Sequence, residues 1–230
     1  MGFRDREAAG RELVALLARY ARRTDVVVFA LPRGGVPVAY EVALRLHAPL
    51  DVLTVRKLGV PGHRELAMGA ISSGGHYVLD EELLGVVRVS RDELFDVIHR
   101  ELAELDRREQ LYRGNRPFPN LKGKIAIVVD DGLATGATMS AAVKALRAQG
   151  PARIVVAVPV GASETCTMLR SYADEVVCVQ TPVEFGAVGV HYQNFNQVSD
   201  DEVRVLLARA AYHYDVTRAV EPPETYPGAL

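Results

Sequence analysis

The segment from Ile125 to Thr138 constrains the fold more than any other part of the chain. Its first five residues, Ile125 to Val129, are apolar and mostly β-branched, which is typical of a strand buried on both faces. Two carboxylates, Asp130 and Asp131, follow directly. A small-residue turn then leads into an amphipathic helix that we expect to begin near Met139. Strand, turn and helix in this order predict an α/β fold with a parallel sheet covered on both faces.

The turn itself has the composition of an anion site. Backbone N–H groups can converge at a helix N-terminus, where the helix dipole favours an anion, most often phosphate. The residues that would supply them are Ala134, Thr135, Gly136, Ala137 and Thr138. The preceding Asp130 and Asp131 can accept hydrogen bonds from vicinal hydroxyls, as on a ribose, or face a metal ion through water. The alternative is a chance Gly/Thr-rich turn with an Asp pair as helix cap.

A family resemblance enters at this motif. Val128 to Thr138 closely resembles the segment with which type I phosphoribosyltransferases bind 5-phosphoribosyl 1-diphosphate (PRPP): two hydrophobic residues, two acids, a short spacer, Thr-Gly and Thr. The order of the other elements extends the resemblance from about Val26 to about Val203. The nearest likeness is to bacterial proteins described only as predicted phosphoribosyltransferases. The resemblance implies a parallel-sheet core with helices on both faces, a flexible lid loop or hairpin, a helical insertion and a small hood segment.

Apolar periodicity predicts where the elements lie. We expect one phosphoribosyltransferase-like domain over residues 1–214, with the hood at about 181–196, and a loose C-terminal tail at 215–230 that holds three prolines. Expected helices cover 4–23, 36–46, 90–112, 139–149, 162–172 and 199–214, and expected core strands cover 26–30, 51–55, 125–129, 154–160 and 175–180.

The first strand–helix turn is a second candidate for ligand binding. It reads Leu-Pro-Arg-Gly-Gly, in which Gly34 and Gly35 let the backbone approach a ligand closely and Arg33 offers a charged fork to phosphate oxygens. An ordinary turn is the alternative. In the resembled family the loop after the first core strand binds pyrophosphate, which implies that role for Arg33, Gly34 and Gly35.

The Gly-rich segment from Lys57 to Gly75 is the expected lid. In the resembled family the corresponding segment is a mobile loop that closes over the reacting centre, which implies catalytic roles for Lys57 and Glu65. The alternative is a solvated hairpin, and the pattern after Ala70 predicts a hairpin that ends at Leu79. The sequence leaves open which charged residue of this region touches substrate.

The hood segment carries several aromatic side chains in a polar, Gly-bearing loop, and such residues can stack on a planar ring. Pro182 to Phe185 resembles the Pro-x-x-Phe stretch of purine-type relatives, which implies that Phe185 presents the acceptor base. Core packing is the alternative for Tyr192 and Phe195. In 6-oxopurine relatives an Asp precedes the Thr-Gly of the main motif, whereas this chain has Ala134. That difference implies weak use of hypoxanthine and guanine, unless Glu184 or His191 replaces the missing group.

Composition and missing motifs exclude several classes of function. The chain has 230 residues and a net charge of −2, so no overall charge drives it toward nucleic acid or an anionic membrane. No apolar run approaches the roughly 18 residues of a membrane span, and the start lacks a signal-peptide core, so we expect a cytoplasmic protein. Cys166 and Cys178 are predicted to be unpaired thiols. The first turn lacks Gly-x-Gly-x-x-Gly, which argues against a dinucleotide-binding oxidoreductase.

The function predicted by motif and resemblance is phosphoribosyl transfer from PRPP to a nitrogenous, nucleobase-like acceptor, with release of pyrophosphate and dependence on Mg²⁺. The expected catalytic residues are Asp130, Asp131, Arg33, Lys57 and Glu65, and the two aspartates are also the expected metal residues, acting through water. The alternative is a non-catalytic regulatory protein that binds PRPP or nucleotides on the same fold. The expected partners are small molecules, with neither nucleic acid nor membrane, and the expected assembly is a homodimer.

Overall fold

The computed structural model describes residues 2–220, except for the side chains of Arg64, Glu65 and Val220. The elements of the core are α1 (Arg6–Leu16), η1 (Ala18–Tyr20), β1 (Val26–Ala30), α2 (Gly35–Leu46), β2 (Leu50–Val52), β6 (Ile125–Val129), α5 (Ala137–Arg147), β7 (Arg153–Val160), α6 (Ser163–Leu169), β8 (Glu175–Gln180) and α7 (Asp200–Val220). Between β2 and β6 come β3 (Val55–Val60), β4 (His63–Ser72), β5 (Tyr77–Leu79), α3 (Glu81–Val87) and α4 (Arg91–Arg113), and the short helix η2 (Val188–His191) lies in the hood.

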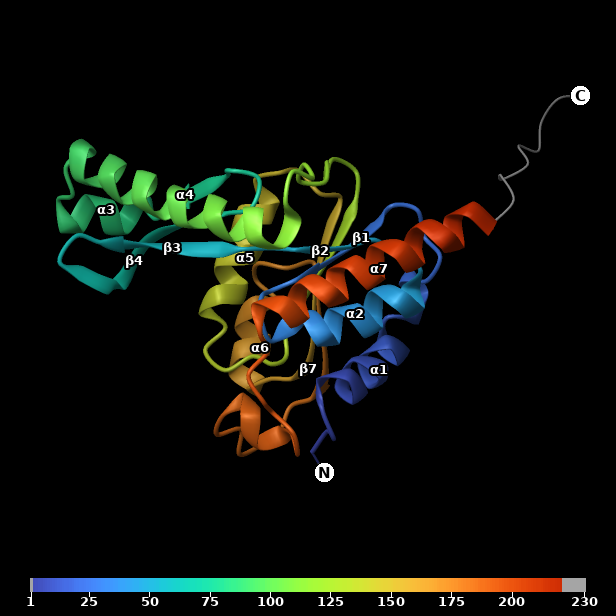
Figure 1. Cartoon of the computed structure of the whole chain (residues 1–230). Coiled ribbons are helices and arrows are strands. Elements are labelled where there is room, and N and C mark those ends of the chain that lie inside the picture. The colour runs from blue at the N-terminus through green and yellow to red at the C-terminus, as the bar shows by residue number, and fades with distance from the viewer. Residues whose placement is uncertain (1, 221–230) are drawn as a thin grey trace, which may run out of the picture.

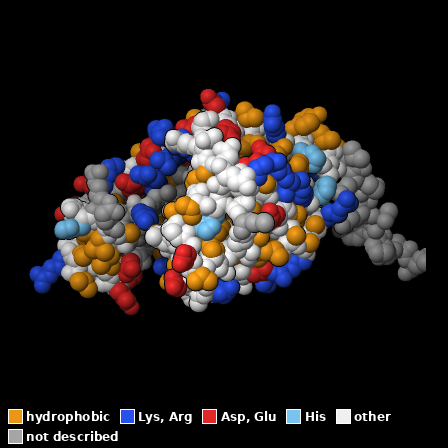
Figure 2. Space-filling view, turned by 90° about the horizontal axis from the view of Figure 1, so that it is seen from below, with side chains coloured by type: hydrophobic (Ala, Val, Ile, Leu, Met, Phe, Trp, Pro, Cys, Tyr) orange, Lys and Arg blue, Asp and Glu red, His pale blue; other side chains and the backbone are white. Residues whose placement is uncertain are grey.

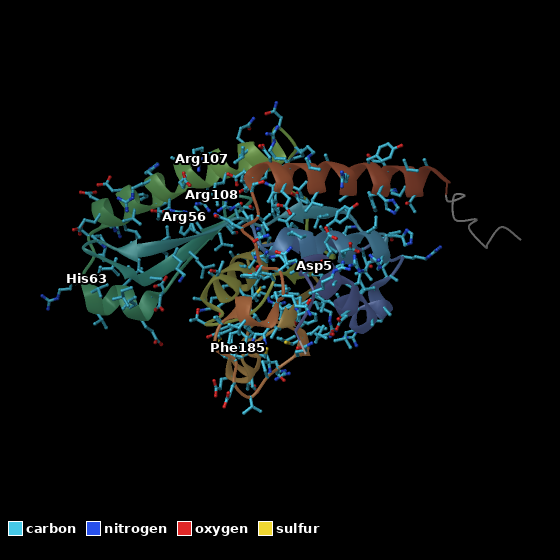
Figure 3. All side chains as sticks on the ribbon, turned by 60° about the horizontal axis from the view of Figure 1, so that its bottom comes forward. Asp5, Arg56, His63, Arg107, Arg108 and Phe185 are labelled. Atoms are coloured by element: carbon cyan, nitrogen blue, oxygen red, sulfur yellow. The ribbon has the colours of Figure 1, made fainter. Side chains whose placement is uncertain are left out.

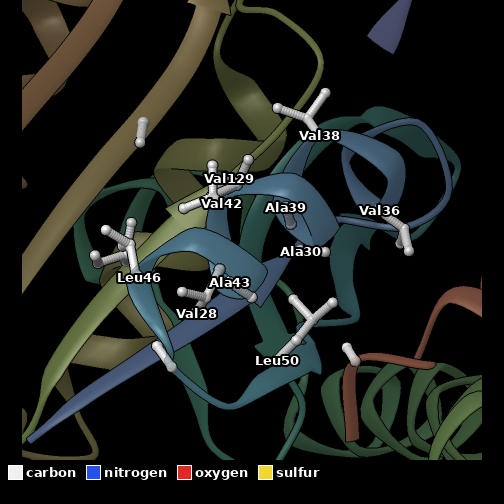
Figure 4. Close-up of a cluster of buried hydrophobic side chains, with 14 of the residues drawn as sticks. Val28, Ala30, Val36, Val38, Ala39, Val42, Ala43, Leu46, Leu50 and Val129 are labelled. Atoms are coloured by element: carbon white, nitrogen blue, oxygen red, sulfur yellow. The ribbon is translucent and has the colours of Figure 1, made fainter. Parts of the chain in front are cut away.

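The central sheet is parallel and has the strand order β2-β1-β6-β7-β8. Helices α1, α2 and α7 cover one face and α5 and α6 the other (Figure 1). Successive side chains point to opposite faces of a strand, so Val28 and Ala30 pack under α2 while Val27 and Phe29 pack toward α5. Figure 4 shows the first of these clusters. The predicted α/β fold, with helices on both faces, is confirmed.

The strand order reverses between β1 and β6. From β1 the chain proceeds through α2 to β2 at one edge, and from β6 it proceeds through α5 and α6 to β7 and β8 on the other side. In open α/β sheets, ligands bind at the carboxyl ends of the strands at such a switch point. The two loops that start there are 31–35 and 130–136, the two that the sequence singled out.

A second, antiparallel sheet of β3, β4 and β5 forms an arm with α3 and α4 (Figure 1). Residues 57–75, which were expected to form a lid loop or hairpin, are mostly paired strands, because Leu58, Met68 and Ile71 are fully buried and form a small core with α4. The predicted strand 51–55 is also divided, since β2 ends at Val52 and β3 starts at Val55. The hairpin to Leu79 was predicted correctly, whereas α3 was not predicted.

The ends of the long helices refine the sequence interpretation. The capping box of α4 is present, with Ser90 and Glu93 bonded reciprocally. The closing helix α7 continues to Val220, so residues 215–220 are helical and not a loose tail, and residues 221–230 lie outside the described part. The helix expected over 4–23 ends at Leu16 and is followed by η1. Cys166 and Cys178 are free thiols, as predicted.

The surface carries charges of both signs. On the face in Figure 2, Lys and Arg side chains are interspersed with Asp and Glu side chains and with small hydrophobic areas. No helix within residues 2–220 combines the length and the apolar character needed to cross a bilayer.

Candidate functional site

The loops after β1 and β6 touch each other at the switch point. A Cβ added to Gly34 would overlap Oδ2 of Asp131, and one added to Gly35 would lie 2.7 Å from the carbonyl oxygen of Val129. No side chain fits in either place, so both glycines are required for this close approach. The Arg-Gly-Gly turn and the acidic pair are therefore in direct contact.

The turn before α5 has the geometry of an anion cradle. Gly136 is the N-cap residue of α5 and has a φ of +68°, a left-handed conformation that favours glycine. The Thr165 hydroxyl of α6 donates to the carbonyl oxygen of Ala134 at 2.5 Å and holds the turn in place. Amides in the first turn of a helix have no partner within the helix. The amide of Ala137 donates to the Thr135 hydroxyl at 3.5 Å, and Thr135 and Thr138 are exposed, so the first turn of α5 starts at an accessible surface.

The acidic pair holds a proton more tightly than two separate carboxyl groups would. Burial, followed by repulsion from Asp131, raises the pKa of Asp130 well above its usual range. Burial also raises the pKa of Asp131, although its ion pair with Arg6 opposes that shift. The Arg6 Nε lies 2.8 Å from Oδ2 of Asp131. Carboxyl oxygens at this position can accept hydrogen bonds from the vicinal hydroxyls of a sugar.

A cavity of about 420 Å³ opens beside the pair, on the side of α7 and the hood. Arg33 is partly exposed there, and its Nη1 lies 3.9 Å from Oδ1 of Asp200 at the start of α7. The cavity brings together two arginines, one acid and one aromatic ring, a combination suited to a polar, phosphorylated ligand with a planar group. Its lining residues are Arg6, Arg33, Gly34, Asp131, Phe195, Gln197 and Val198.

The arm approaches the cradle from the other side. Lys57 is exposed on β3, and a second cavity, of about 580 Å³, lies between this side chain and Ala137 and Ser140 in the first turns of α5. Arg56 points instead to Glu101 of α4, with Nη2 and Oε2 2.6 Å apart (Figure 3). Figure 3 places His63 at the far tip of the arm. The side chain of Glu65, the other expected lid residue, lies outside the described residues.

Some aromatic residues of the hood pack in the interior, and one lines the 420 Å³ cavity. Phe185 is half-buried, its ring lies 5.4 Å from that of His191, and it packs against the small buried cluster that includes Phe3 and Tyr192. Nε2 of His191 lies 2.8 Å from the carbonyl oxygen of Phe185. Figure 3 shows Phe185 at the end of the molecule opposite α4 and α7. Tyr192 is buried, as the core-packing alternative has it, whereas Phe195 is partly exposed and lines the 420 Å³ cavity.

The comparison with protein-family models decides the affiliation. The model of the phosphoribosyl transferase domain matches residues 4–194. The chain belongs to this family. The match covers the whole parallel sheet, the arm and most of the hood, so every residue of the candidate site between Arg6 and Phe185 lies within the phosphoribosyl transferase domain.

Similar proteins agree with this assignment. The chain is 48% identical over 227 residues to proteins from two strains of Mycobacterium tuberculosis, CDC 1551 and H37Rv, which are named provisionally as phosphoribosyl transferases. That match covers 96% of this chain and 51% of the relatives, so the chain spans about half the length of the curated relatives it matches. A crystal structure of the protein TT1426 from Thermus thermophilus superposes with a TM-score of 0.82 at 43% identity, covering 91% of this chain and 99% of that one.

Two residues that contact the candidate site lie outside the PRPP-type motif Val128 to Thr138. Arg6 comes from the first turn of α1 and Thr165 from α6, 125 and 31 residues away from their respective partners Asp131 and Ala134. Arg6 stands in the sequence as one arginine among several on the polar side of an amphipathic helix. No local pattern marks it as a neighbour of the acidic pair, and only the folded chain shows the contact.

The residues present fit the Mg²⁺ that phosphoribosyl transferase chemistry uses. Mg²⁺ keeps several waters and is usually held by one or two carboxylates together with substrate phosphates. Asp130 and Asp131 are adjacent carboxylates beside a phosphate-type turn, which is a donor set of that kind. Within residues 2–220 no group of three or more His, Cys, Asp or Glu side chains is placed to hold a metal by itself.

Proposed function

We propose that this chain is a phosphoribosyltransferase that transfers the phosphoribosyl group of PRPP to a nitrogenous, nucleobase-like acceptor and releases pyrophosphate. The observation that carries the proposal is the contact between the Arg-Gly-Gly turn after β1 and the acidic pair after β6 at the switch point of the sheet. This contact supports a site in which the turn before α5 would bind the phosphate of PRPP, the acidic pair its ribose and the Arg-Gly-Gly turn its pyrophosphate.

The reaction breaks the bond between the anomeric carbon and a pyrophosphate oxygen, and the acceptor nitrogen forms a bond to the same carbon. Positive charge develops on the ribose, as in glycoside cleavage. The protein must hold the reactants in line, neutralise the leaving group and exclude water. Most of the catalytic effect is therefore positioning and electrostatic stabilisation, which suits a site that offers backbone amides, carboxylates and arginines.

Each task has a residue suited to it. The amides of residues 134–138 would bind the 5-phosphate, and Asp130 and Asp131 the ribose hydroxyls. Arg33, with the backbone of Gly34 and Gly35, would bind the pyrophosphate. Asp130 and Asp131 would hold a bound Mg²⁺ through water, and the ion would supply positive charge to the leaving pyrophosphate. Lys57 would close over the cradle from the arm, together with Glu65.

The acceptor is proposed to be one that needs no acid at position 134. Ala134 can neither donate nor accept a proton through its side chain, and a missing general base typically costs about 10²–10⁴-fold in rate. His191, a candidate replacement, is engaged with the carbonyl of Phe185. The ratio of kcat/KM for adenine and hypoxanthine is expected to favour adenine. Efficient turnover of hypoxanthine would refute this and direct attention to Glu184 or His191.

The test of the proposed function is pyrophosphate release from PRPP in the presence of Mg²⁺, across a panel of purines, pyrimidines and simple amines. Release that depends on one class of acceptor is the expected result. PRPP binding without turnover on any acceptor would contradict the enzyme and favour a regulatory role on the same fold. The Asp130→Asn/Asp131→Asn variant serves as the blank.

A further inference from the structure

The N-terminal segment pairs with the hood. The amide of Phe3 donates to the carbonyl oxygen of His191 at 2.8 Å, and the amides of Gln193 and Asn194 donate to the carbonyl oxygens of Phe3 and Arg4 at 2.8 and 2.9 Å. The Phe3 and Tyr192 rings are 5.5 Å apart. This pairing fixes the start of α1 beside the loop after β6. The first residue of α1 is thereby brought to the candidate site from the opposite end of the sequence.

That residue, Arg6, is held by three contacts. Its Nε donates to Oδ2 of Asp131 at 2.8 Å, its Nη1 donates to the carbonyl oxygen of Asn196 at 2.8 Å, and its guanidinium carbon lies 3.8 Å from the centre of the Phe195 ring. Only 11% of the Arg6 side chain and 14% of the Asp131 side chain are exposed. Charge-assisted bonds and a cation–π contact in a poorly solvated place hold a guanidinium firmly.

The residue that carries this carboxylate is also held through its backbone. The Tyr192 hydroxyl donates to the backbone carbonyl of Asp131 at 2.6 Å, and Gly34 leaves room where a side chain would strike Oδ2. With Arg6 bonded to Oδ2, Oδ1 is the oxygen that remains for a ligand. Arg6 and Asp131 also line the same 420 Å³ cavity.

We propose that Arg6 is a positioning residue of the ribose subsite, which holds the Asp131 carboxylate so that its second oxygen accepts a hydrogen bond from a sugar hydroxyl. This inference rests on the proposed function, because it takes the ligand to be a ribose phosphate. It adds to that function a contribution from the N-terminal helix that lies outside the PRPP motif. Its consequence is selectivity for the sugar hydroxyls, separate from affinity for the phosphate.

The test is calorimetry with ribose 5-phosphate, 2-deoxyribose 5-phosphate and 3-deoxyribose 5-phosphate. The wild type should prefer ribose over at least one deoxy sugar by about 10–100-fold, the range for one hydrogen bond to a charged group. In Arg6→Gln that preference should fall to about twofold, while affinity for the deoxy sugar changes little. Arg6→Lys, which keeps the charge, should restore part of the preference. A purely structural role would lower all three affinities together and leave the preference unchanged.

Two further variants make the test specific. Arg4→Gln removes the arginine two positions earlier, whose side chain is 67% exposed and paired with Asp5, and should behave as the wild type. In an Asp131→Asn background, Arg6→Gln should cause no further loss of preference. Full preference retained in Arg6→Gln would overturn the inference alone. A wild type that binds none of the three sugars would overturn the proposed function and the inference with it.

Discussion

The two sheets of this protein are built in opposite ways. Every residue of β1 and β6 is buried, because helices cover both faces of the parallel sheet. The antiparallel sheet of the arm packs Leu58, Met68 and Ile71 against α3 and α4, whereas the exposed Lys57 of β3 borders the 580 Å³ cavity. The ligand loops thus extend from the better-buried sheet, and the arm borders the second cavity with a partly solvated surface.

This difference separates two tasks that one loop cannot perform equally well. Phosphate and diol binding need fixed amides and carboxylates, which a sheet buried on both faces supplies. Closure over a reacting centre needs a segment whose local opening requires little free energy. A segment with fewer buried contacts meets that requirement. Mutations in the two regions should therefore affect different measurements, and the predictions that follow test this separation.

The largest expected effect follows from removal of the acidic pair. Asp130→Asn/Asp131→Asn should weaken PRPP binding at least about 100-fold, since two hydrogen bonds to charged acceptors are lost. The repulsion within the pair is also removed, but Arg6 loses its partner, so we expect a melting temperature within about 5 °C of wild type. Arg56→Gln, which breaks an ion pair inside the arm, is the matched control and should bind PRPP normally. Wild-type affinity in the double variant, measured by calorimetry, would contradict the assignment.

A second prediction concerns the cradle. Gly136→Val should abolish binding of ribose 5-phosphate, because the left-handed φ is strained for valine and the new Cβ would lie 2.5 Å from the Thr165 methyl group. Gly150→Val is matched, since Gly150 has a φ of +69° at the other end of α5 with open space around it. Both variants should lose about 1–3 kcal/mol of stability through backbone strain. Only Gly136→Val should lose the ligand, and equal binding by both would show that the amides are not the cradle.

Hydrogen exchange tests the comparison of the sheets themselves. Amides of β1 and β6 should exchange only through global unfolding, whereas those of β3, β4 and β5 should exchange through a smaller opening of the arm. Leu58→Ala should lower the free energy of that local opening by about 2–5 kcal/mol and leave β6 less affected, whereas Ile127→Ala should lower the protection of both sheets. PRPP with Mg²⁺ should slow exchange in the arm. If Leu58→Ala reduced protection equally in both sheets, the arm would not be a separate unit.

The smallest expected effect is a dependence of stability on pH. The raised pKa of Asp130 means that the folded chain keeps a proton that the unfolded chain loses near its ordinary pKa of 3.8. Wild-type stability therefore falls as the pH rises from that value through the raised one, and stays lower above it. Asp130→Asn has no such proton. Its free energy of unfolding, measured with urea, should therefore increase relative to that of wild type as the pH rises from about 4 to about 8. Asp96→Asn, at an exposed position of α4, is the control, and a constant difference across this range would contradict the prediction.

The parallel core could be predicted because its signals are local. Each central strand is an uninterrupted apolar run, as in Ile125 to Val129, and the ligand loops carry short motifs directly after these runs. The strand ends were therefore placed within a few residues. The sequence did not predict the strand order, so the switch point and the close approach of Gly34 to Asp131 come from the structure alone.

The arm and the N-terminal contribution could not be predicted in the same way. In β3 and β4, buried residues such as Leu58 and Met68 alternate with glycines and charged residues, and this mixture resembles a loop until the strands are paired. The contact of Arg6 with Asp131 spans 125 residues and depends on the pairing of Phe3 with the hood. Long-range pairing of this kind leaves no trace in local composition.

The most direct test of the central claim is a crystal of the wild-type chain soaked with ribose 5-phosphate. The account predicts that the phosphate lies on the backbone amides of residues 134–138 and that the sugar hydroxyls lie within hydrogen-bond distance of Asp130 and Asp131, with Arg6 still on Oδ2 of Asp131. The contrary result is a sugar phosphate bound elsewhere, such as the 580 Å³ cavity beside Lys57 and Lys144, with the turn before α5 free of phosphate. That outcome would place the ligand site on the arm and not at the switch point of the parallel sheet.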